Sequence, residues 1–303
     1  MSKLWPVLLT ILLCAGAGFL LHGAWQVRRP DAAASPAEAD RIVSLAPNLT
    51  EILFALGLQD KVVAVSSDSD YPPAATAKTK VGTFWQPNIE AIIASKPDLV
   101  MPLWFPQQKA VAESLRRLGY PVLTLRIQTI PDLLSAIQQI GAATGTAKRA
   151  DELVKSISDK IDHWRSARHK TDPIKVLWVV QTEPLRVAGR DTFINELVEL
   201  AGGENAIGPT LQQYPPISSE ELLACQAEVI FQSAMNNQVI SAQQEAAKKF
   251  WSRWPSLPAV QNNRIYVVEP DIVSRLGTRL CQGIELIAHH LHADASGQAA
   301  KSK

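Results

Sequence analysis

The sequence predicts an α/β protein of two similar lobes, whose central and mainly parallel sheets are joined by a long rigid helix. Strands alternate with helices along most of the chain, a pattern that favours parallel sheets. In addition, one helix-to-strand block occurs twice, at 90–101 and 220–231. Each copy has a glutamate at the helix start, an apolar helical turn, a polar break with an acidic residue and a buried strand. The repeat favours two lobes that face each other as a clamp.

Length and composition agree with this prediction. At 303 residues the chain is too long for one small core and fits two α/β lobes. Hydrophobic residues make up 47% and charged residues 19%, as in ordinary globular proteins. The formal net charge of +1 gives no electrostatic support for a nucleic-acid partner. We therefore expect a protein that does not bind nucleic acid. We also expect it to be a monomer.

Residues 1–27 are the predicted signal or membrane anchor, in which a nearly uncharged apolar segment, 4–27, follows Lys3. It is long enough, at about 20 residues, to span a bilayer and is typical of an export signal. Ala15 and Ala17 allow cleavage of a signal peptide, and Cys14 allows lipid modification. Because the apolar run continues past these residues, the sequence favours an uncleaved membrane anchor. We expect the folded part in the periplasm, tethered to or exported across the inner membrane.

The remaining chain divides by composition and periodicity. A linker rich in Ala, Pro and Asp precedes the lobes, and a small, polar tail that we expect to be disordered follows them. The predicted linker, amino-terminal lobe, helical spine, carboxyl-terminal lobe and tail are 28–40, 41–129, 130–172, 173–292 and 293–303.

Individual elements follow from hydrophobic periodicity, helix caps and glycine stops. The predicted strands are 41–45, 62–65, 99–103, 122–125, 175–181, 229–232 and 264–268. The predicted helices are 48–57, 88–95, 107–118, 131–144, 147–168, 192–201, 219–225, 242–251 and 275–292. The spine helix 147–168 carries an amphipathic stripe at i, i+4, i+8 and i+11, made of Leu153, Ile157, Ile161 and Trp164.

Catalytic and metal-binding motifs are missing from the sequence. Its six histidines lie in the apolar segment, the spine or the last helix: His22, His163, His169, His289, His290 and His292. There is no H-E-x-x-H, G-x-S-x-G or Walker motif. A metal receptor or a histidine-dependent triad needs such side chains in the cleft. We therefore expect a binding protein with no metal site and no cofactor, not an enzyme.

Aromatic residues occupy the loops that follow predicted strands. They are Tyr71, Trp85, Trp104 and Tyr214. In parallel α/β sheets such loops form the ligand crevice, and aromatic rings there offer rigid, mostly apolar contact surface. Each ring taken alone is equally compatible with a lid over the core, but together they favour a ligand site.

Glu90 and Glu220 begin the helices of the two repeat copies. Either one alone is explained by a favourable interaction with the helix dipole, worth about 0.3–1 kcal/mol. Their equivalence in two lobes also fits docking onto a two-fold symmetric basic partner, where such charges steer association and fix register.

Five segments in order resemble the periplasmic cobalamin-binding proteins of vitamin importers. These belong to the helical-backbone (class III) substrate-binding proteins of ABC transporters, together with siderophore and haem receptors. The resemblance covers 41–292 and rests on 41–51, 69–73, 85–90, 96–100 and 202–205.

The resemblance implies roles for particular residues. Those it places against a corrinoid are Tyr71, Trp85, Trp104, Tyr214, Asp271 and Arg275. It also implies that Glu90 and Glu220 dock onto arginines of a permease dimer.

Two departures from the family pattern concern the second lobe. A contact aromatic is replaced around 185–186, and Ala201 stands where the family has one half of a disulfide, with Cys281 at the other half. Cys225 is the only other cysteine of the folded part, so we take it as the substitute partner for Cys281.

The leading hypothesis is a protein that captures cobalamin or a related corrinoid and delivers it to an ABC permease. Within the same superfamily, the alternative is a siderophore or haem receptor. Two other classes stay open: an enzyme on this scaffold that processes corrinoids or metals, and a membrane-tethered structural or signalling subunit without ligand binding.

Overall fold

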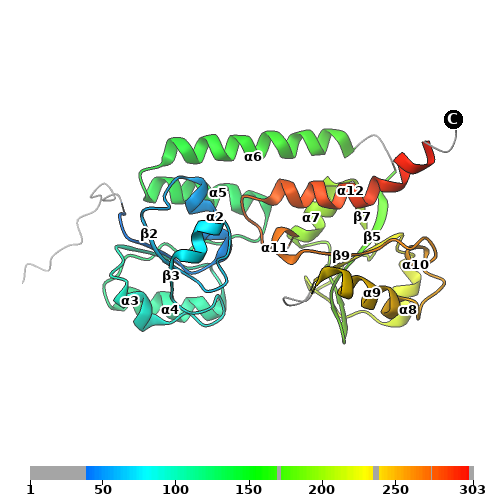
Figure 1. The fold of residues 1–303 in the computed structure, drawn as a ribbon, viewed down its shortest axis with the longest axis horizontal. Helices are drawn as coiled ribbons and strands as arrows, with labels where there is room; N and C mark the ends of the chain where they lie inside the picture. The colour runs from blue at the N-terminus through cyan, green and yellow to red at the C-terminus, as the bar shows by residue number, and fades with distance from the viewer. Residues whose placement is uncertain (1–38, 169–171, 235–238, 274, 300–303) are drawn as a thin grey trace, which may run out of the picture. The chain divides into compact units, whose positions relative to one another are not determined.

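A computed structural model describes residues 39–299 except 169–171, 235–238 and 274 (Figure 1). The predicted anchor 1–27 and nearly all of the linker 28–40 lie outside the described residues. Within the described part, no helix combines the length and the apolar character needed to cross a membrane.

The amino-terminal lobe is a four-stranded parallel sheet in the order β3-β2-β1-β4. Its strands are β1 (Ile42–Ser44), β2 (Val62–Val65), β3 (Thr79–Lys80) and β4 (Leu99–Met101). Its helices are α2 (Pro47–Ala55), the 3-10 helix η1 (Pro73–Ala77), α3 (Ile89–Ala94) and α4 (Pro106–Arg117). Proline at the first turn of α2 and of α4 fits the helix φ and needs no hydrogen-bond partner.

The carboxyl-terminal lobe has a five-stranded sheet in the order β6-β5-β8-β9, with β7 also paired to β5. Its strands are β5 (Ile174–Thr182), β6 (Leu185–Val187), β7 (Gly203–Asn205), β8 (Val229–Ser233) and β9 (Ile265–Val268). Its helices are α7 (Phe193–Leu200), α8 (Ser219–Ala224), α9 (Ile240–Trp251), α10 (Pro258–Gln261), α11 (Pro270–Val273) and α12 (Leu280–Ala299). All pairings are parallel except that of β6 with β5.

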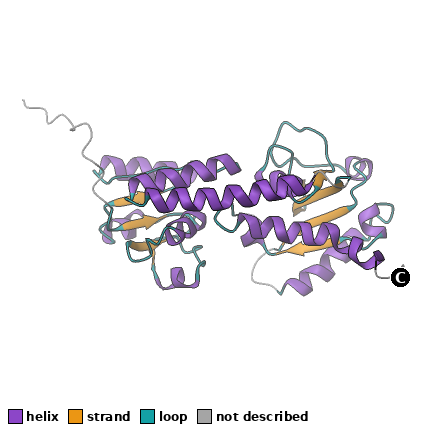
Figure 2. Ribbon diagram, turned by 90° about the horizontal axis from the view of Figure 1, so that it is seen from above, coloured by secondary structure: helices purple, strands orange, loops and turns teal. Residues whose placement is uncertain are grey.

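Two helices form the spine, α5 (Ile130–Ala143) and α6 (Ala147–Arg168). A capping box of Thr129 and Asp132 starts α5. Gly141 lets the two helices approach closely, because a Cβ there would lie 2.4 Å from the Ala150 Cβ. Helix α6 runs along the top of the molecule, and the view from above shows helices lying over the strands of both sheets (Figures 1 and 2).

The largest hydrophobic cluster extends through both lobes and the spine. It contains Leu53 of α2, Ile140 of α5, Ile161 of α6 and Ile284 of α12, all almost fully buried. The predicted stripe on α6 is confirmed, since its four residues all pack in or against this cluster. Shared packing of this kind holds the lobes together more firmly than a flexible linker does.

The predicted fold class is confirmed, and the differences are local. Residues 122–125 do not form a full strand. They make only isolated parallel bridges, from Val122 to Val100 of β4 and from Leu125 to Leu103 just after β4. The short elements β3, β6, β7, α10 and α11 were not predicted. The last helix begins at Leu280, not at 275, because the segment before it crosses to the other lobe. It also continues to Ala299, where we expected disorder from 293 onward, and 300–303 lie outside the described residues.

Candidate functional site

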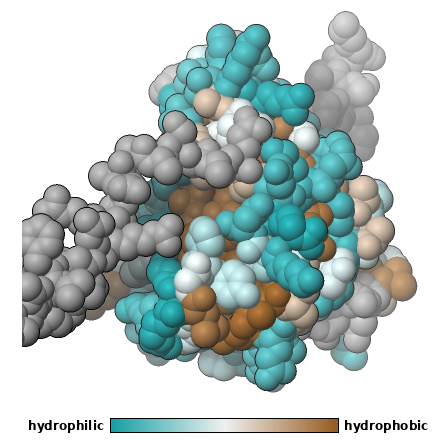
Figure 3. Space-filling model, turned by 90° about the vertical axis from the view of Figure 1, so that its left-hand side faces the viewer, coloured by the Kyte–Doolittle hydropathy of each residue, from teal (hydrophilic) through white to brown (hydrophobic). Residues whose placement is uncertain are grey.

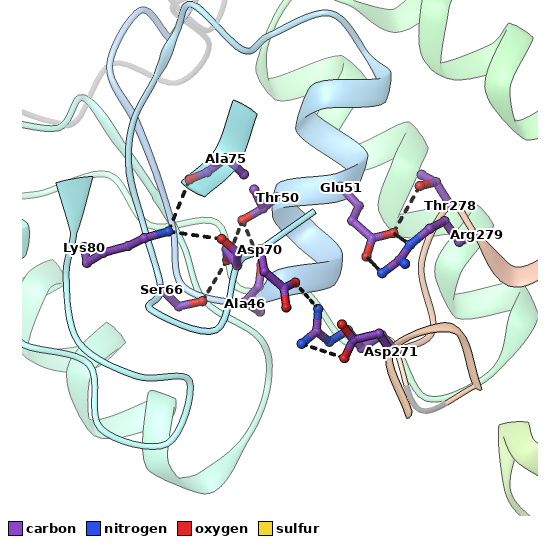
Figure 4. Close-up of polar contacts among 12 residues, drawn as sticks. Ala46, Thr50, Glu51, Ser66, Asp70, Ala75, Lys80, Asp271, Thr278 and Arg279 are labelled. Carbon is purple, nitrogen blue, oxygen red and sulfur yellow. Dashed lines mark hydrogen bonds and ion pairs between the residues drawn. The ribbon is translucent and has the colours of Figure 1, made fainter. Parts of the chain in front are cut away.

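The carboxyl-end loops of the two sheets meet through residues 275–279, which we call the cross-lobe strap. Arg275 Nη1 lies 2.5 Å from Asp70 Oδ1 in the loop after β2, and Arg275 Nη2 lies 2.9 Å from Asp271 Oδ1 of α11 (Figure 4). Arg275 thus joins a carboxylate of each lobe. The family resemblance implied roles for Asp271 and Arg275, whereas it gave none to Asp70.

A second ion pair lies deeper in the strap. Arg279 Nη2 lies 2.7 Å from Glu51 Oε1 of α2, and the two side chains are only 12% and 2% exposed (Figure 4). The Arg279 guanidinium also stacks 4.1 Å from the ring centroid of Tyr71. Asn48 Nδ2 donates a 3.0 Å hydrogen bond to the Leu276 carbonyl. The amino-terminal start of α2 is therefore bonded to the opposite lobe.

These contacts shift the ionisation of the strap carboxylates. Burial favours the protonated form of Asp70, but the hydrogen bond and charge of Arg275 outweigh it and hold the pKa of Asp70 below its usual value. Burial raises the pKa of Asp271, and the charge of Asp70 adds to this rise although Arg275 opposes it. For Arg279, burial lowers the pKa, yet the bond and charge of Glu51 raise it above its ordinary value.

A buried hydroxyl network positions the loop that carries Asp70 and Tyr71. Thr50 Oγ1 lies 2.8 Å from Ser44 Oγ and 3.0 Å from Ser69 Oγ, which lies 2.8 Å from Ser66 Oγ. Lys80 Nζ donates to the carbonyls of Ser69 and Ala75 at 3.1 and 3.2 Å (Figure 4). The loop is therefore fixed from below before any ligand arrives.

The predicted aromatic residues of the amino-terminal lobe remain accessible at the carboxyl end of its sheet. Tyr71, Trp85 and Trp104 are 39%, 57% and 57% exposed, although large aromatic side chains are usually buried. The Trp85 ring packs edge-on against Phe84 and Phe105, at centroid distances of 5.1 and 5.2 Å. The arrangement leaves a rigid aromatic surface facing solvent.

Gln108, a residue with no signal in the sequence, joins these loops from beneath. Its side chain is fully buried. Its Nε2 donates to the carbonyls of Leu45 and Phe84 at 2.9 and 3.0 Å, and its Oε1 accepts from the Leu103 N–H at 2.7 Å. One side chain thus satisfies three backbone groups from three loops, which fixes the aromatic surface in place.

Tyr214 differs from the other predicted aromatic contacts. It is half-buried and packs against the large core cluster, and burial raises the pKa of its hydroxyl. Its carbonyl accepts a 3.0 Å hydrogen bond from Arg186 Nη1. The structure therefore places Tyr214 partly as a core residue of its lobe.

The repeated block has the same local structure in both lobes. Helices α3 and α8 have six residues each and are capped by Asn88 and Ser218, with Glu90 and Glu220 in the first turn. Each helix is followed by a left-handed residue, Lys96 with φ 47° and Gln226 with φ 49°. Both glutamates are exposed.

The acidic residue before the strand of each copy, Asp98 or Glu228, bonds to the backbone at or just before the start of another strand. Asp98 carboxylate oxygens accept from the N–H groups of Asp40 and Arg41 at 2.9 and 3.0 Å. Glu228 Oε2 accepts from the Lys175 N–H at 2.9 Å. This part of the repeat therefore has a structural role, whereas Glu90 and Glu220 are exposed to solvent.

At the end of the amino-terminal lobe, hydrophilic and hydrophobic side chains are interspersed on the surface (Figure 3).

The predicted disulfide between Cys225 and Cys281 is wrong, since both thiols are free. Cys225 ends α8 and packs against a second hydrophobic cluster of the carboxyl-terminal lobe, which includes Leu222 and Trp251. Its Sγ lies 3.0 Å from the Leu222 carbonyl oxygen. Cys281 is buried in the first turn of α12. Burial raises the pKa of both thiols. The described residues contain no group of three or more His, Cys, Asp or Glu side chains suited to a metal ion.

A pocket of about 490 Å³ lies among α5, α6 and α7, away from the aromatic loops. Glu196 of α7 lines it and accepts a 3.1 Å hydrogen bond from the Ile130 N–H at the start of α5. Burial raises the pKa of Glu196, and the charges of Asp132 and Glu199 raise it further despite that bond. The ionised carboxylate is thus disfavoured in the folded state.

We expect Glu196→Gln to stabilise the protein at pH 7. A pKa raised on folding means that stability is lost as the pH rises through the folded-state pKa, so the neutral amide avoids this loss. The gain in unfolding free energy, measured by urea denaturation, is expected to vanish near pH 4, where the wild-type carboxyl is largely protonated. Glu152→Gln, exposed on α6, is the control. A loss of stability at pH 7 would contradict the assignment.

A model of the family described as periplasmic binding protein matches residues 42–272, most of the chain. This chain belongs to the periplasmic binding protein family. A relative 33% identical over 267 residues is the uncharacterized ABC transporter substrate-binding lipoprotein YvrC of Bacillus subtilis, with 85% of this chain and 81% of YvrC covered. The vitamin B12-binding protein of Vibrio parahaemolyticus is 27% identical over 257 residues, covering 84% of this chain and 90% of that protein.

Solved structures show the same fold. The periplasmic vitamin B12 binding protein BtuF of Vibrio cholerae matches with a TM-score of 0.72 and 28% identity, covering 84% of this chain and 98% of BtuF. A periplasmic heme binding protein of Pseudomonas aeruginosa matches with a TM-score of 0.72 and 27% identity, covering 83% and 92%. The resemblance stated from the sequence is confirmed. The chain is a periplasmic solute-binding protein of an ABC transporter.

Proposed function

We propose that this periplasmic binding protein captures cobalamin or a related corrinoid between its lobes and delivers it to an ABC permease. The observation that carries the proposal is the exposed aromatic surface of Tyr71, Trp85 and Trp104 at the carboxyl ends of the strands. Flat rings of this kind suit a large, mostly apolar macrocycle. The names of the vitamin B12-binding relatives support the same ligand.

In this proposal the cross-lobe strap forms the second wall of the site. Asp271 and Arg275 would contact polar groups of the ligand, and Tyr214 would contribute from its half-buried position. The strap and the shared core hold the lobes together, so binding would need only a small closure. No cofactor takes part, since the corrinoid is cargo.

Titration of the purified full-length chain with cyanocobalamin, followed by calorimetry and tryptophan quenching, tests the proposal. We expect saturable binding with one ligand per chain. Lack of binding at micromolar ligand would refute a corrinoid function. A parallel titration with haemin tests the second candidate, a haem receptor, which is favoured by the likeness to the heme binding protein structure.

We expect Trp85→Ala to weaken corrinoid binding about 30-fold, because truncating a central aromatic contact typically costs about 2 kcal/mol. The dissociation constant from calorimetry measures this. Leu118→Ala is a matched control, since Leu118 belongs to the same lobe, is 59% exposed and closes α4 away from the aromatic loops. Equal binding by wild type and Trp85→Ala would remove Trp85 from the site.

A further inference from the structure

The pocket among α5, α6 and α7, which we call the spine pocket, lies outside the site proposed for the corrinoid. Its volume is about 490 Å³, within the range of about 300–1,000 Å³ that is usual for small-molecule sites. Helix α6 packs against both α5 and α7 and runs above them in Figure 1. The spine pocket is therefore built from the two spine helices and one helix of the carboxyl-terminal lobe.

The three helices give the spine pocket a fixed hydrocarbon surface. The lining residues of α6 and of α7 are spaced as i, i+3 and i+4, so each of these helices presents a single face. The aliphatic lining consists of Ile130 and Leu134 of α5, Ile161 of α6 and Leu200 of α7. All four side chains belong to the large hydrophobic cluster or pack against it. Their positions are therefore set by the core before any ligand enters.

The charged side chains of the spine pocket are mostly acidic. Among the described residues that line it, Arg165 is the only cation, and its Nη1 lies 2.7 Å from Asp162 Oδ1. Glu196 and Glu199 of α7 line the same pocket, and Glu199 Oε1 accepts a 3.0 Å hydrogen bond from Asn195 Nδ2. Because Arg165 is already paired with Asp162, it does not compensate the charge of Glu196.

Glu196 is the carboxylate of the pocket that has an open acceptor atom. Its Oε2 accepts a 3.1 Å hydrogen bond from the Ile130 N–H, whereas its Oε1 has no bonding partner among the described residues. The side chain is half-buried, which weakens its solvation by water. The like charges of Asp132 and Glu199 also act on it. A carboxylate in these surroundings favours a cation as its partner.

We propose that the spine pocket binds an organic cation with a short hydrocarbon body, of the alkylammonium class. The ammonium group pairs with Glu196 Oε1, and the hydrocarbon lies on Ile130, Leu134 and Ile161. A charge-assisted hydrogen bond and burial of methylene groups both favour this occupant. A metal ion fits less well, because the described residues contain no group of three His, Cys, Asp or Glu side chains suited to one. Binding here is independent of the corrinoid, since the spine pocket lies away from the aromatic loops.

Calorimetric titration of the purified full-length chain with hexylammonium chloride tests this proposal. We expect saturable binding that is about tenfold weaker for Glu196→Gln, which removes the charge and keeps the shape of the side chain. Ethylammonium chloride has the charge with little hydrocarbon, and sodium hexanoate has the chain with the opposite charge. Each should bind wild type at least about tenfold more weakly than hexylammonium does. Glu152→Gln is the matched control, because it removes the same charge from an exposed position of α6 outside the pocket.

A second variant blocks the spine pocket without changing its charge. Ser158 lines the pocket from α6 and is half-buried, so Ser158→Trp should fill the space and abolish binding of hexylammonium. Circular dichroism checks that both variants are folded. Wild-type affinity in Glu196→Gln or in a folded Ser158→Trp would overturn the proposal, as would lack of binding by wild type at millimolar hexylammonium.

Trp85→Ala separates the spine pocket from the aromatic loops, where a cation could also stack on a ring. We expect this variant to bind hexylammonium as tightly as wild type does. A loss of hexylammonium binding in Trp85→Ala would place the amine on the aromatic loops and refute the spine pocket as its site. Failure of cyanocobalamin to bind leaves these expectations unchanged, so the two proposals are tested separately.

Discussion

Replacing Glu51 by glutamine is expected to lower the free energy of unfolding by about 3 kcal/mol, because it leaves the buried Arg279 guanidinium without its counter-charge. Both side chains are nearly inaccessible, and the pair is bonded at two points, 2.7 and 3.2 Å. The Glu51 carboxylate also lies 3.4 Å from Thr278 Oγ1. Urea denaturation followed by circular dichroism gives the free energy directly.

The design separates charge burial from packing. In the double variant Glu51→Leu, Arg279→Met both charges are gone, and we expect most of the stability to return. Asp159→Asn breaks an exposed pair with Lys155, whose side chains are 74% and 63% exposed, and should cost under about 1 kcal/mol. If Glu51→Gln costs no more than this control, the buried pair does not stabilise the contact between the lobes.

The second large effect is expected from reversing the charges of Glu90 and Glu220. We propose that these exposed glutamates, at the same position of α3 and α8, dock onto basic residues of a permease dimer. Like charges brought together at an interface cost several kcal/mol, and lysines at these positions would face the basic residues of the permease. The double variant Glu90→Lys, Glu220→Lys should therefore transport about tenfold more slowly, or slower still. Uptake of radiolabelled cyanocobalamin into proteoliposomes measures it, with each single variant giving an intermediate rate.

Ligand affinity provides the internal check for docking. The double variant should bind cyanocobalamin as tightly as wild type, because neither glutamate lies on the loops that carry the aromatic surface. Glu113→Lys, an exposed reversal on α4, should transport normally. Wild-type transport by the double variant, or loss of ligand binding in it, would refute the docking role.

The repeated block shows how much the sequence alone can give. Its helix starts, its breaks at Lys96 and Gln226 and its strands are set by caps, turn residues and hydrophobic periodicity, all of which act within a few residues. For the same reason the exposed loops holding Trp85 and Trp104 could be placed beyond the ends of strands. That Cys225 and Cys281 are unpaired could not be predicted in this way, because disulfide formation depends on the distance between two remote elements.

Local patterns in the sequence were enough to predict the α/β class, the two lobes, the amphipathic spine and the exposed aromatic residues beyond the strand ends. The folded structure alone shows that Arg279 pairs with Glu51 and Arg275 with Asp70, across 228 and 205 residues of chain. It also decided that the last helix begins at Leu280, since the preceding segment bonds to the other lobe instead of continuing a helix. Contacts of this kind become favourable only when folding brings the partners together and removes them from water, so no local pattern encodes them.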